Sequence, residues 1–374
     1  MKLVFASDSF KGTLTSEQTS ELLNKAAQEV FGECDTVSVN VADGGEGTID
    51  AVIKALNGTR QYVDVHDPLN NIIKSFYGKI DEERAIIEMA PASGLTLVPE
   101  DKRNPRLATS YGTGELVRDA LINGARDITI AIGGSATNDG GMGFARALGI
   151  EFYDKNGNKL EGRGEDLFNV YDIDMSGLMP EAKAAHFTVM CDVTNPLCGS
   201  NGATYTYGRQ KGASDDDLGF LEKGMQNYRD VIKEKFGKDA DKISGSGAAG
   251  GMGAALSIYL NAEMKSGIEA VLDVIGFDSL IEGADFIITG EGRTDIQSTY
   301  GKVVSGIGKR GRKYGIPVIV LCGSLGDGYE KLYDHGVKKI ISVSEGEEIS
   351  KVLASPSEYY YKSAIKMFTE LVDK

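Results

Sequence analysis

The stretch DITIAIGGSATNDGG, residues 127–141, decides how this chain is expected to fold. Residues 127–132 form a largely apolar run, which is typical of a buried strand, and a glycine-rich turn follows at once. The segment after the turn is expected to be a helix that ends near Leu148 and Gly149. A strand, a glycine turn and a helix in this order form the repeating unit of a parallel sheet covered by helices.

The same unit recurs on both sides of this stretch. A strand over residues 3–6 precedes a helix near residues 15–31, where Thr15 and Gln18 match a capping box. Further strands are predicted over residues 37–41, 187–191, 286–289, 316–322 and 339–343, before a final helix near 359–372. We therefore predict an α/β protein with a parallel sheet and helices on both faces. Its ligands are expected beyond the carboxyl ends of the strands, where the glycine turns lie.

Two irregular stretches interrupt this rhythm and suggest a second domain inserted into the first. The chain has 374 residues, which is enough for two or three domains. We predict a first domain formed by residues 1–64, 109–148 and 248–374. Residues 65–108 and 149–247 are assigned to the inserted domain.

The composition excludes several classes of protein. The formal net charge is −15 and no cluster of Lys and Arg stands out in the sequence, which disfavours nucleic acid and anionic membrane as partners. Four scattered cysteines and three histidines argue against a structural zinc site and are typical of a cytosolic enzyme. We find neither a signal peptide nor an apolar run long enough for a membrane span. The sequence therefore predicts a cytoplasmic protein that binds no membrane.

Two polar turns near the start of the chain could bind ligands. Residues 8–12 (DSFKG) follow the first strand and could bind a small acid or a phosphate, although a surface turn with an Asp–Lys pair would look the same. Residues 43–48 (DGGEGT) lie between a strand and a helix, where backbone N–H groups attract anions. The two acids of this second turn could instead hold Mg²⁺, or simply favour the helix start.

Two later glycine loops carry stronger signals for phosphate. Residues 133–141 contain four glycines, two hydroxyls, an amide and a carboxylate, and such a loop can wrap its N–H groups around an anion. Residues 290–295 (GEGRTD) follow another strand, and Arg293 and Lys302 are cations well suited to phosphate. Asp295 or Glu291 could complete a Mg²⁺ site, while a surface loop with paired charges is the alternative.

Asp192 ends another predicted strand and is a candidate general base or metal ligand, or an ordinary turn residue. Residues 245–250 match GxGxxG, but a polar turn precedes them instead of the strand that a dinucleotide site requires. The chain has no P-loop motif and no protein-kinase signature. Several glycine loops, several acids and few cations together suit phosphoryl transfer with Mg²⁺.

These blocks resemble the bacterial glycerate kinases in their order and spacing, over essentially the whole chain. The blocks that carry the resemblance are residues 8–12, 43–48, 133–141, 191–199, 247–254 and 289–295. The resemblance implies a Rossmann-like α/β domain with a second, smaller α/β domain inserted, and an active site in the cleft between them. It also implies transfer of the γ-phosphoryl group of ATP to a hydroxyl of D-glycerate with Mg²⁺, giving 2-phosphoglycerate.

The resemblance leads to hypotheses for individual residues. We assign Asp192 as the base and Lys11 as a catalytic cation. The groups assigned to bind the substrate are Asp8, Ser9, Lys11 and Arg293. Those assigned to the ATP phosphates are Gly133, Gly134, Ser135, Asn138, Gly290, Gly292 and Thr294. The predicted metal ligands are Asp43, Asp295 and Glu46.

Three other functions remain as alternatives. The same scaffold could phosphorylate a related small hydroxy acid, which a panel of substrates would reveal. An NAD(P)-dependent oxidoreductase would bind NAD(P)H tightly, and a metabolite-binding protein would bind a ligand without ATP turnover. The sequence leaves the oligomeric state open, a homodimer included.

Overall fold

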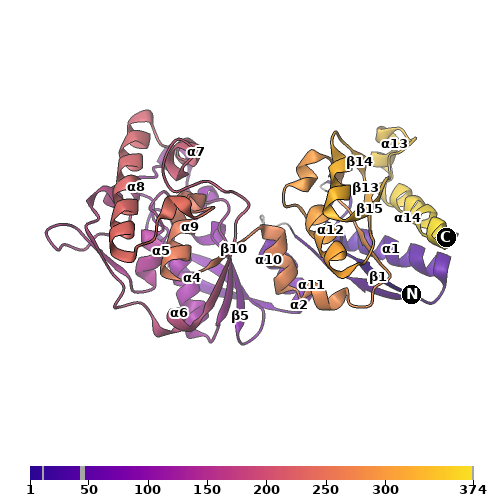
Figure 1. Ribbon diagram of the computed structural model, residues 1–374, viewed down its shortest axis with the longest axis horizontal. Helices are drawn as coiled ribbons and strands as arrows, with labels where there is room; N and C mark the ends of the chain where they lie inside the picture. Colours follow the sequence, from indigo (N-terminus) through magenta and orange to yellow (C-terminus); the bar gives the residue numbers. More distant parts are fainter. Residues whose placement is uncertain (11, 43–46, 373–374) are drawn as a thin grey trace. The chain divides into compact units, whose positions relative to one another are not determined.

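The computed structural model of the protein describes residues 1–10, 12–42 and 47–372. Its contacts divide the chain into unit 1, formed by Met1–Asp43 and Gly267–Lys374, and unit 2, formed by Gly44–Ser266 (Figure 1). Unit 2 is therefore inserted into unit 1. It is the longer of the two, whereas the inserted domain was expected to be the smaller one.

Unit 1 is a doubly wound parallel sheet. In the described part of the chain its strands are β1 (Lys2–Phe5), β2 (Asp35–Ser38), β11 (Phe286–Thr289), β13 (Val318–Cys322) and β15 (Val337–Ser342). The strands are parallel throughout and lie in the order β15-β13-β11-β1-β2. Its helices are α1 (Ser16–Phe31), α10 (Gly267–Val274), α11 (Phe277–Leu280), α12 (Val303–Tyr314), α13 (Ile349–Ala354) and α14 (Pro356–Val372). Its shorter elements are β12 (Arg293–Thr294), β14 (Ser324–Leu325), η6 (Ile296–Thr299) and η7 (Tyr329–His335).

The sheet of unit 1 is buried on both faces, since alternate residues of a strand point to opposite faces and the consecutive residues Leu3, Val4 and Phe5 of β1 are all buried. Leu3 and Phe5 of β1 pack with α1 and α14 in one hydrophobic cluster that also includes Phe368. The N-terminus of α1 has the predicted capping box between Thr15 and Gln18. The α/β architecture with a parallel sheet, predicted from the repeated strand, glycine turn and helix, is confirmed.

Unit 2 contains a mixed sheet. Its described strands are β3 (Thr59–His66), β4 (Ile72–Lys79), β5 (Arg84–Glu88), β6 (Asp127–Ala131), β9 (His186–Met190) and β10 (Glu263–Lys265), with β7 (Glu151–Tyr153) and β8 (Asp172–Asp174) apart. Strands β5, β6, β9 and β10 are parallel, and β3 and β4 add an antiparallel edge. Its helices are α2 (Thr48–Leu56), α3 (Ala90–Ser93), α4 (Tyr111–Ile122), α5 (Met142–Ala147), α6 (Pro180–Ala184), α7 (Ala203–Tyr207), α8 (Asp215–Phe236) and α9 (Ala248–Tyr259). Its 3₁₀ helices are η1 (Leu95–Leu97), η2 (Glu100–Lys102), η3 (Gly164–Asn169), η4 (Arg209–Lys211) and η5 (Ala240–Lys242).

The contacts divide the chain differently from the predicted domains. Residues 44–64, 109–148 and 248–266 were assigned to the first domain, but the contacts group them with unit 2. The physical reason is the pairing of β6, which bonds to β5 on one side and to β9 on the other. A strand pattern shows that a segment joins a sheet, but it does not show which sheet. The predicted cleft between domains stays a prediction.

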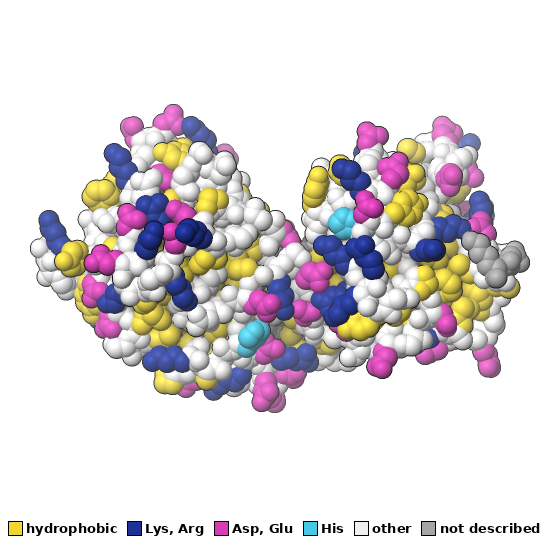
Figure 2. All heavy atoms as spheres, viewed as in Figure 1, with side chains coloured by type: hydrophobic (Ala, Val, Ile, Leu, Met, Phe, Trp, Pro, Cys, Tyr) yellow, Lys and Arg dark blue, Asp and Glu magenta, His cyan; other side chains and the backbone are white. Residues whose placement is uncertain are grey.

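Charged side chains of both signs lie interspersed on the face shown in Figure 2. Ion pairs at the protein surface include Arg60 with Asp50 and Lys362 with Glu358. Exposed pairs of this kind contribute little to stability. Within the described residues, no helix combines the length and the apolar character needed to cross a membrane.

Candidate active site

The site in unit 1 lies where the strand order of the sheet reverses. From β1 the chain moves to β2 on one side, and β11 lies on the other side of β1. Ligands of doubly wound sheets bind at this switch point, beyond the carboxyl ends of the strands. The loops after β1 and β11 leave the sheet together, since the Asp8 N–H donates to the Gly290 carbonyl at 2.9 Å. Both loops were predicted to bind ligands.

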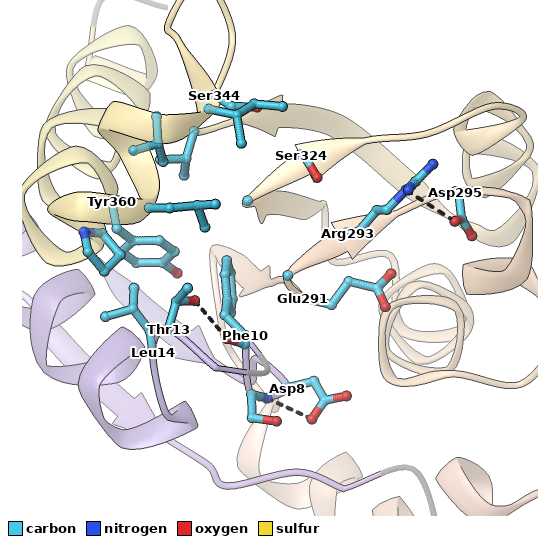
Figure 3. A pocket seen from close by; sticks show the side chains of 18 of the residues that line it. Asp8, Phe10, Thr13, Leu14, Glu291, Arg293, Asp295, Ser324, Ser344 and Tyr360 are labelled. Carbon is cyan, nitrogen blue, oxygen red and sulfur yellow. Dashed lines mark hydrogen bonds and ion pairs between the residues drawn. The ribbon is translucent and has the colours of Figure 1, made fainter.

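A cavity of about 430 Å³ opens at this point (Figure 3). Five charged residues line it, namely Asp8, Glu291, Arg293, Asp295 and Lys302. The predicted site residues Ser9 and Gly292 also line it. The fold thus brings together groups that are far apart in the sequence. Gly290 and Thr294 of the same loop, which were also predicted to bind phosphate, are buried.

Arg293 and Asp295 form an ion pair at one side of the cavity. The Arg293 Nε lies 3.6 Å from Asp295 Oδ2, and the arginine side chain is 68% exposed. Asp295 also accepts a hydrogen bond from the Gln297 backbone N–H at 2.8 Å and so caps η6. The carboxylate of Asp295 therefore has a structural role beside its predicted role as a metal ligand. Arg293 presents most of its guanidinium surface to solvent.

The glycine loop after β6 in unit 2 is only partly open. Gly133 and Gly134 are exposed and line a second cavity of about 470 Å³. Ser135 and Asn138, also predicted to bind phosphate, are buried. The Asn138 side chain donates to Thr204 Oγ1 at 3.2 Å. Two of the four predicted phosphate groups of this loop therefore face a cavity, and the other two face the protein interior.

Asp192 follows β9 and is exposed. Because β9 pairs in parallel with β6, Asp192 and the Gly133 loop leave the sheet at the same edge. The turn at residues 245–251 ties these loops together, since Gly140 N–H donates to Gly250 O and Gly247 N–H donates to Asn195 O. A Cβ on Gly250 would lie 2.0 Å from the Thr137 carbonyl. The GxGxxG sequence thus serves close backbone packing, and η5 rather than a strand precedes it.

Lys11, Asp43 and Glu46 lie outside the described residues. The remaining predicted groups fall in both units. Asp8, Ser9, Gly290, Gly292, Arg293, Thr294 and Asp295 belong to unit 1, and Gly133, Gly134, Ser135, Asn138 and Asp192 belong to unit 2.

Comparison with known proteins identifies the family. A model of the glycerate kinase family matches residues 3–372. The chain is 46% identical over 344 residues to the glycerate 2-kinase of Escherichia coli (strain K12), covering 92% of this chain and 90% of that protein. The chain belongs to the glycerate kinase family.

Other members support the same assignment. The chain is 40% identical to the glycerate kinase of Bacillus subtilis (strain 168), covering 97% of this chain and 96% of that one. A crystal structure described as "putative glycerate kinase 2" from Salmonella typhimurium LT2 superposes with a TM-score of 0.87 at 38% identity. That match covers 100% of this chain and 98% of the other, so both units have counterparts in the glycerate kinase family.

Glu291 was considered for the metal but was not among the assigned site residues. It is 7% exposed, and Thr294 Oγ1 donates to its Oε1 at 3.3 Å. Burial raises the pKa of Glu291, the Asp8 carboxylate adds to this increase, and Ser298, Lys302 and Thr294 oppose it. Glu291, Asp8 and Lys302 therefore interact electrostatically at the centre of the candidate glycerate kinase site.

Lys211, by contrast, is a residue that the sequence did not reveal. It is 2% exposed, and its Nζ donates to Ser135 Oγ at 2.8 Å and to the Thr137 carbonyl at 2.6 Å. Burial lowers the pKa of Lys211 to about 7, against the opposing effect of Asp139. Lys211 holds the glycine loop from inside, and no local motif announces it because it lies 76 residues beyond Ser135.

Asp139 completes the interior of this loop. Its carboxylate accepts hydrogen bonds from the backbone N–H of Ser110 at 2.7 Å, of Gly141 at 3.1 Å and of Gly143 at 3.3 Å. The Ser110 hydroxyl donates a fourth bond at 2.7 Å. Burial raises the pKa of Asp139, and these hydrogen bonds oppose the increase. The carboxylate therefore organises the loop and the start of α5.

Glu88, at the end of β5, also lines the cavity of unit 2. It is 8% exposed and accepts a hydrogen bond from the Ile49 N–H, in the first turn of α2, at 2.8 Å. An acid at the end of a largely apolar run, residues 84–88, is the signal in the sequence that points to Glu88. Glu88 joins β5 to the helix that follows residues 43–46.

Proposed function

We propose that the protein is a glycerate kinase that transfers the γ-phosphoryl group of ATP to a hydroxyl of D-glycerate. The observation that carries the proposal is the cavity at the switch point of unit 1, where two cations and three carboxylates converge. Phosphoryl transfer relies mainly on positioning and on neutralising charge. Arg293 and Lys302 supply the positive charge, and the family membership supplies the substrate class.

The residues of unit 1 fit a Mg²⁺ ion that is held together with the phosphates. Among the described residues, no cluster of three or more His, Cys, Asp and Glu could hold a metal ion. Asp8 and Glu291 form a pair of neighbouring carboxylates on the cavity wall, and Mg²⁺ is commonly bound by one or two carboxylates plus substrate phosphates. Asp43 and Glu46 stay predicted ligands. The ion would neutralise charge on the phosphates.

Asp192 is our choice for the group that accepts the proton of the substrate hydroxyl. Its exposed carboxylate follows β9 at the edge of the sheet where Gly133 and Gly134 also lie. A general base contributes typically about 10²–10⁴-fold to the rate. We therefore expect Asp192→Asn to lower kcat by at least about 100-fold with little change in stability. Near-normal turnover at saturating substrate would remove Asp192 from this role.

The test of the proposed function is an incubation of the protein with ATP, Mg²⁺ and D-glycerate, followed by ³¹P NMR. We expect a phosphomonoester signal that requires all three components. Coupling of its phosphorus to one proton identifies 2-phosphoglycerate, our expected product, and coupling to two protons identifies 3-phosphoglycerate. Absence of a signal from folded protein would contradict the proposal, and a panel of small hydroxy acids would then find the substrate.

A further inference from the structure

The cavity of unit 1 has two walls of different chemistry. Figure 3 shows Arg293 and Asp295 on one side and Leu14 and Tyr360 on the other. The second side is continued by residues of the C-terminal helices and the loop before them. These are Val343, Ile349, Val352, Leu353 and Pro356. One wall is therefore charged, and the other is apolar.

The apolar wall is exposed where it could contact a ligand. Ile349 and Leu353 are 59% and 58% exposed, and their spacing of four residues places them on the same face of α13. Tyr360 lines the same cavity, is 1% exposed and packs edge-on against Phe10 with ring centroids 5.4 Å apart. The apolar wall thus combines a buried aromatic ring with exposed aliphatic side chains. Single exposed apolar residues are common, but a pair that faces a cavity is typical of a binding site.

We propose that this apolar wall binds the nucleoside part of the phosphoryl donor, with the adenine ring against Ile349 and Leu353. The inference rests on the proposed function and deepens it. D-glycerate consists of a carboxylate, two hydroxyls and a three-carbon chain, so it has almost no apolar surface to bury. A purine has two flat apolar faces, and burying them removes apolar surface from water on both molecules.

The charged wall of the cavity would bind the phosphates of the donor. Lys302 is the residue before the first turn of α12, a helix of 12 residues. The N–H groups at a helix N-terminus attract phosphate, and Lys302 and Arg293 add positive charge on the same cavity wall. The phosphates would therefore lie toward Arg293 and Lys302, and the base toward α13. Gly292, which was predicted to bind ATP phosphates, lines the same cavity.

The test compares Ile349→Ser and Leu353→Ser with Ile122→Ser in unit 2, where the isoleucine is 61% exposed and lines neither cavity described here. All three residues are exposed, so these exchanges should leave the protein folded. Calorimetric titration with the non-hydrolysable analogue AMP-PNP and Mg²⁺ should show about fivefold to tenfold weaker binding for the first two variants only. Unchanged binding, or an equal loss in Ile122→Ser, would overturn the proposal.

A second measurement, of NMR signals, does not depend on the affinity of the variants for the ligand. The methyl signals of Ile349 can be assigned in the intact chain by their loss in Ile349→Val. AMP-PNP should shift these signals, whereas tripolyphosphate, which has no base, should leave them in place. Equal shifts with both compounds, or none with AMP-PNP, would contradict the nucleoside assignment.

Failure of this inference can be told apart from failure of the proposed function. If only the inference is wrong, the wild type makes phosphoglycerate and the two variants keep their KM for ATP. If only the proposed function is wrong, ³¹P NMR shows no phosphoglycerate, although AMP-PNP still binds and the two variants still weaken it.

Discussion

The loops after β6 and after β11 look alike in the sequence but differ in the structure. Both follow a buried strand, both are rich in glycine, and both contain acidic and hydroxyl-bearing residues. After β11, the charged groups of residues 291–295 face a cavity. After β6, the interior of the loop is filled by Asp139 and Lys211.

The polar groups of a glycine-rich loop can therefore have two different roles. In unit 1 the loop has a buried acid, Glu291, that still lines the cavity, and an arginine that is mostly exposed. In unit 2, the acidic residue Asp139 accepts hydrogen bonds from backbone N–H groups of the loop and of the helix that follows it. Gly133 and Gly134 of this loop line a cavity. The first loop therefore offers side-chain charge to a ligand, and the second offers backbone.

The largest effect on stability should come from the buried acid of unit 2. Asp139→Ala removes four hydrogen bonds and leaves buried N–H groups without a partner, so we expect a loss of about 3 kcal/mol or more in the free energy of unfolding. The matched change in unit 1, Asp295→Ala, removes a cap and should cost about 1 kcal/mol. Urea unfolding followed by circular dichroism suits this chain, which has no tryptophan. Equal losses in the free energy of unfolding for the two variants would contradict the distinction between the loops.

The next largest effect concerns activity. Arg293→Ala should lower kcat/KM by about 100-fold or more, because the variant loses the cation that we propose to bind the transferring phosphoryl group. Its stability should change by less than about 0.5 kcal/mol, since the side chain is 68% exposed. Arg209→Ala is the control, because Arg209 is equally exposed and also paired with an aspartate, Asp215. If both variants lose activity alike, the charged wall of unit 1 has no special role.

Much of the fold could be predicted from sequence. The bounds of β11 match the predicted residues 286–289, and the capping box of α1 is present. These features depend on neighbours in the chain, so local patterns reveal them. The assignment of residues 109–148 to the first domain differed from the structure because the pairing of β6 with β5 and β9 is a tertiary property.

The candidate site was also predictable from the sequence only in part. The loops after β1 and β11 were predicted, and their meeting at the switch point follows from strand order. Lys211 could not be predicted, because its contact with Ser135 spans 76 residues. The interior position of Asn138 was also hidden, since its partner Thr204 is 66 residues away. Residue type and spacing indicated phosphate chemistry, but burial decided which groups reach a cavity.

The buried Lys211 should have a smaller effect, which is a change of stability with pH. The pKa of Lys211 is lowered to about 7 in the folded protein and is about 10.4 in an unfolded chain. Between these values the unfolded state binds more protons, so this group makes stability rise with pH, by up to about 1.4 kcal/mol per unit. The stability of the wild type relative to Lys211→Met should therefore increase from pH 7 to pH 9. Urea unfolding measures the difference, with Lys351→Met as the exposed control, and a constant difference would contradict it.

The smallest effect on stability should come from Gly133→Ala, which also decides whether the loop after β6 binds phosphate. No described atom lies within 4 Å of a Cβ built on Gly133, so the free energy of unfolding should change by less than about 0.5 kcal/mol. Gly134→Ala is the contrast, because a φ of +73° should cost about 1 kcal/mol or more. If the backbone of the loop binds phosphate, the methyl group of Gly133→Ala should raise the KM for ATP about tenfold. A normal KM would mean that the loop after β11 binds the phosphates without help from the loop after β6, and that the glycines of unit 2 serve packing alone.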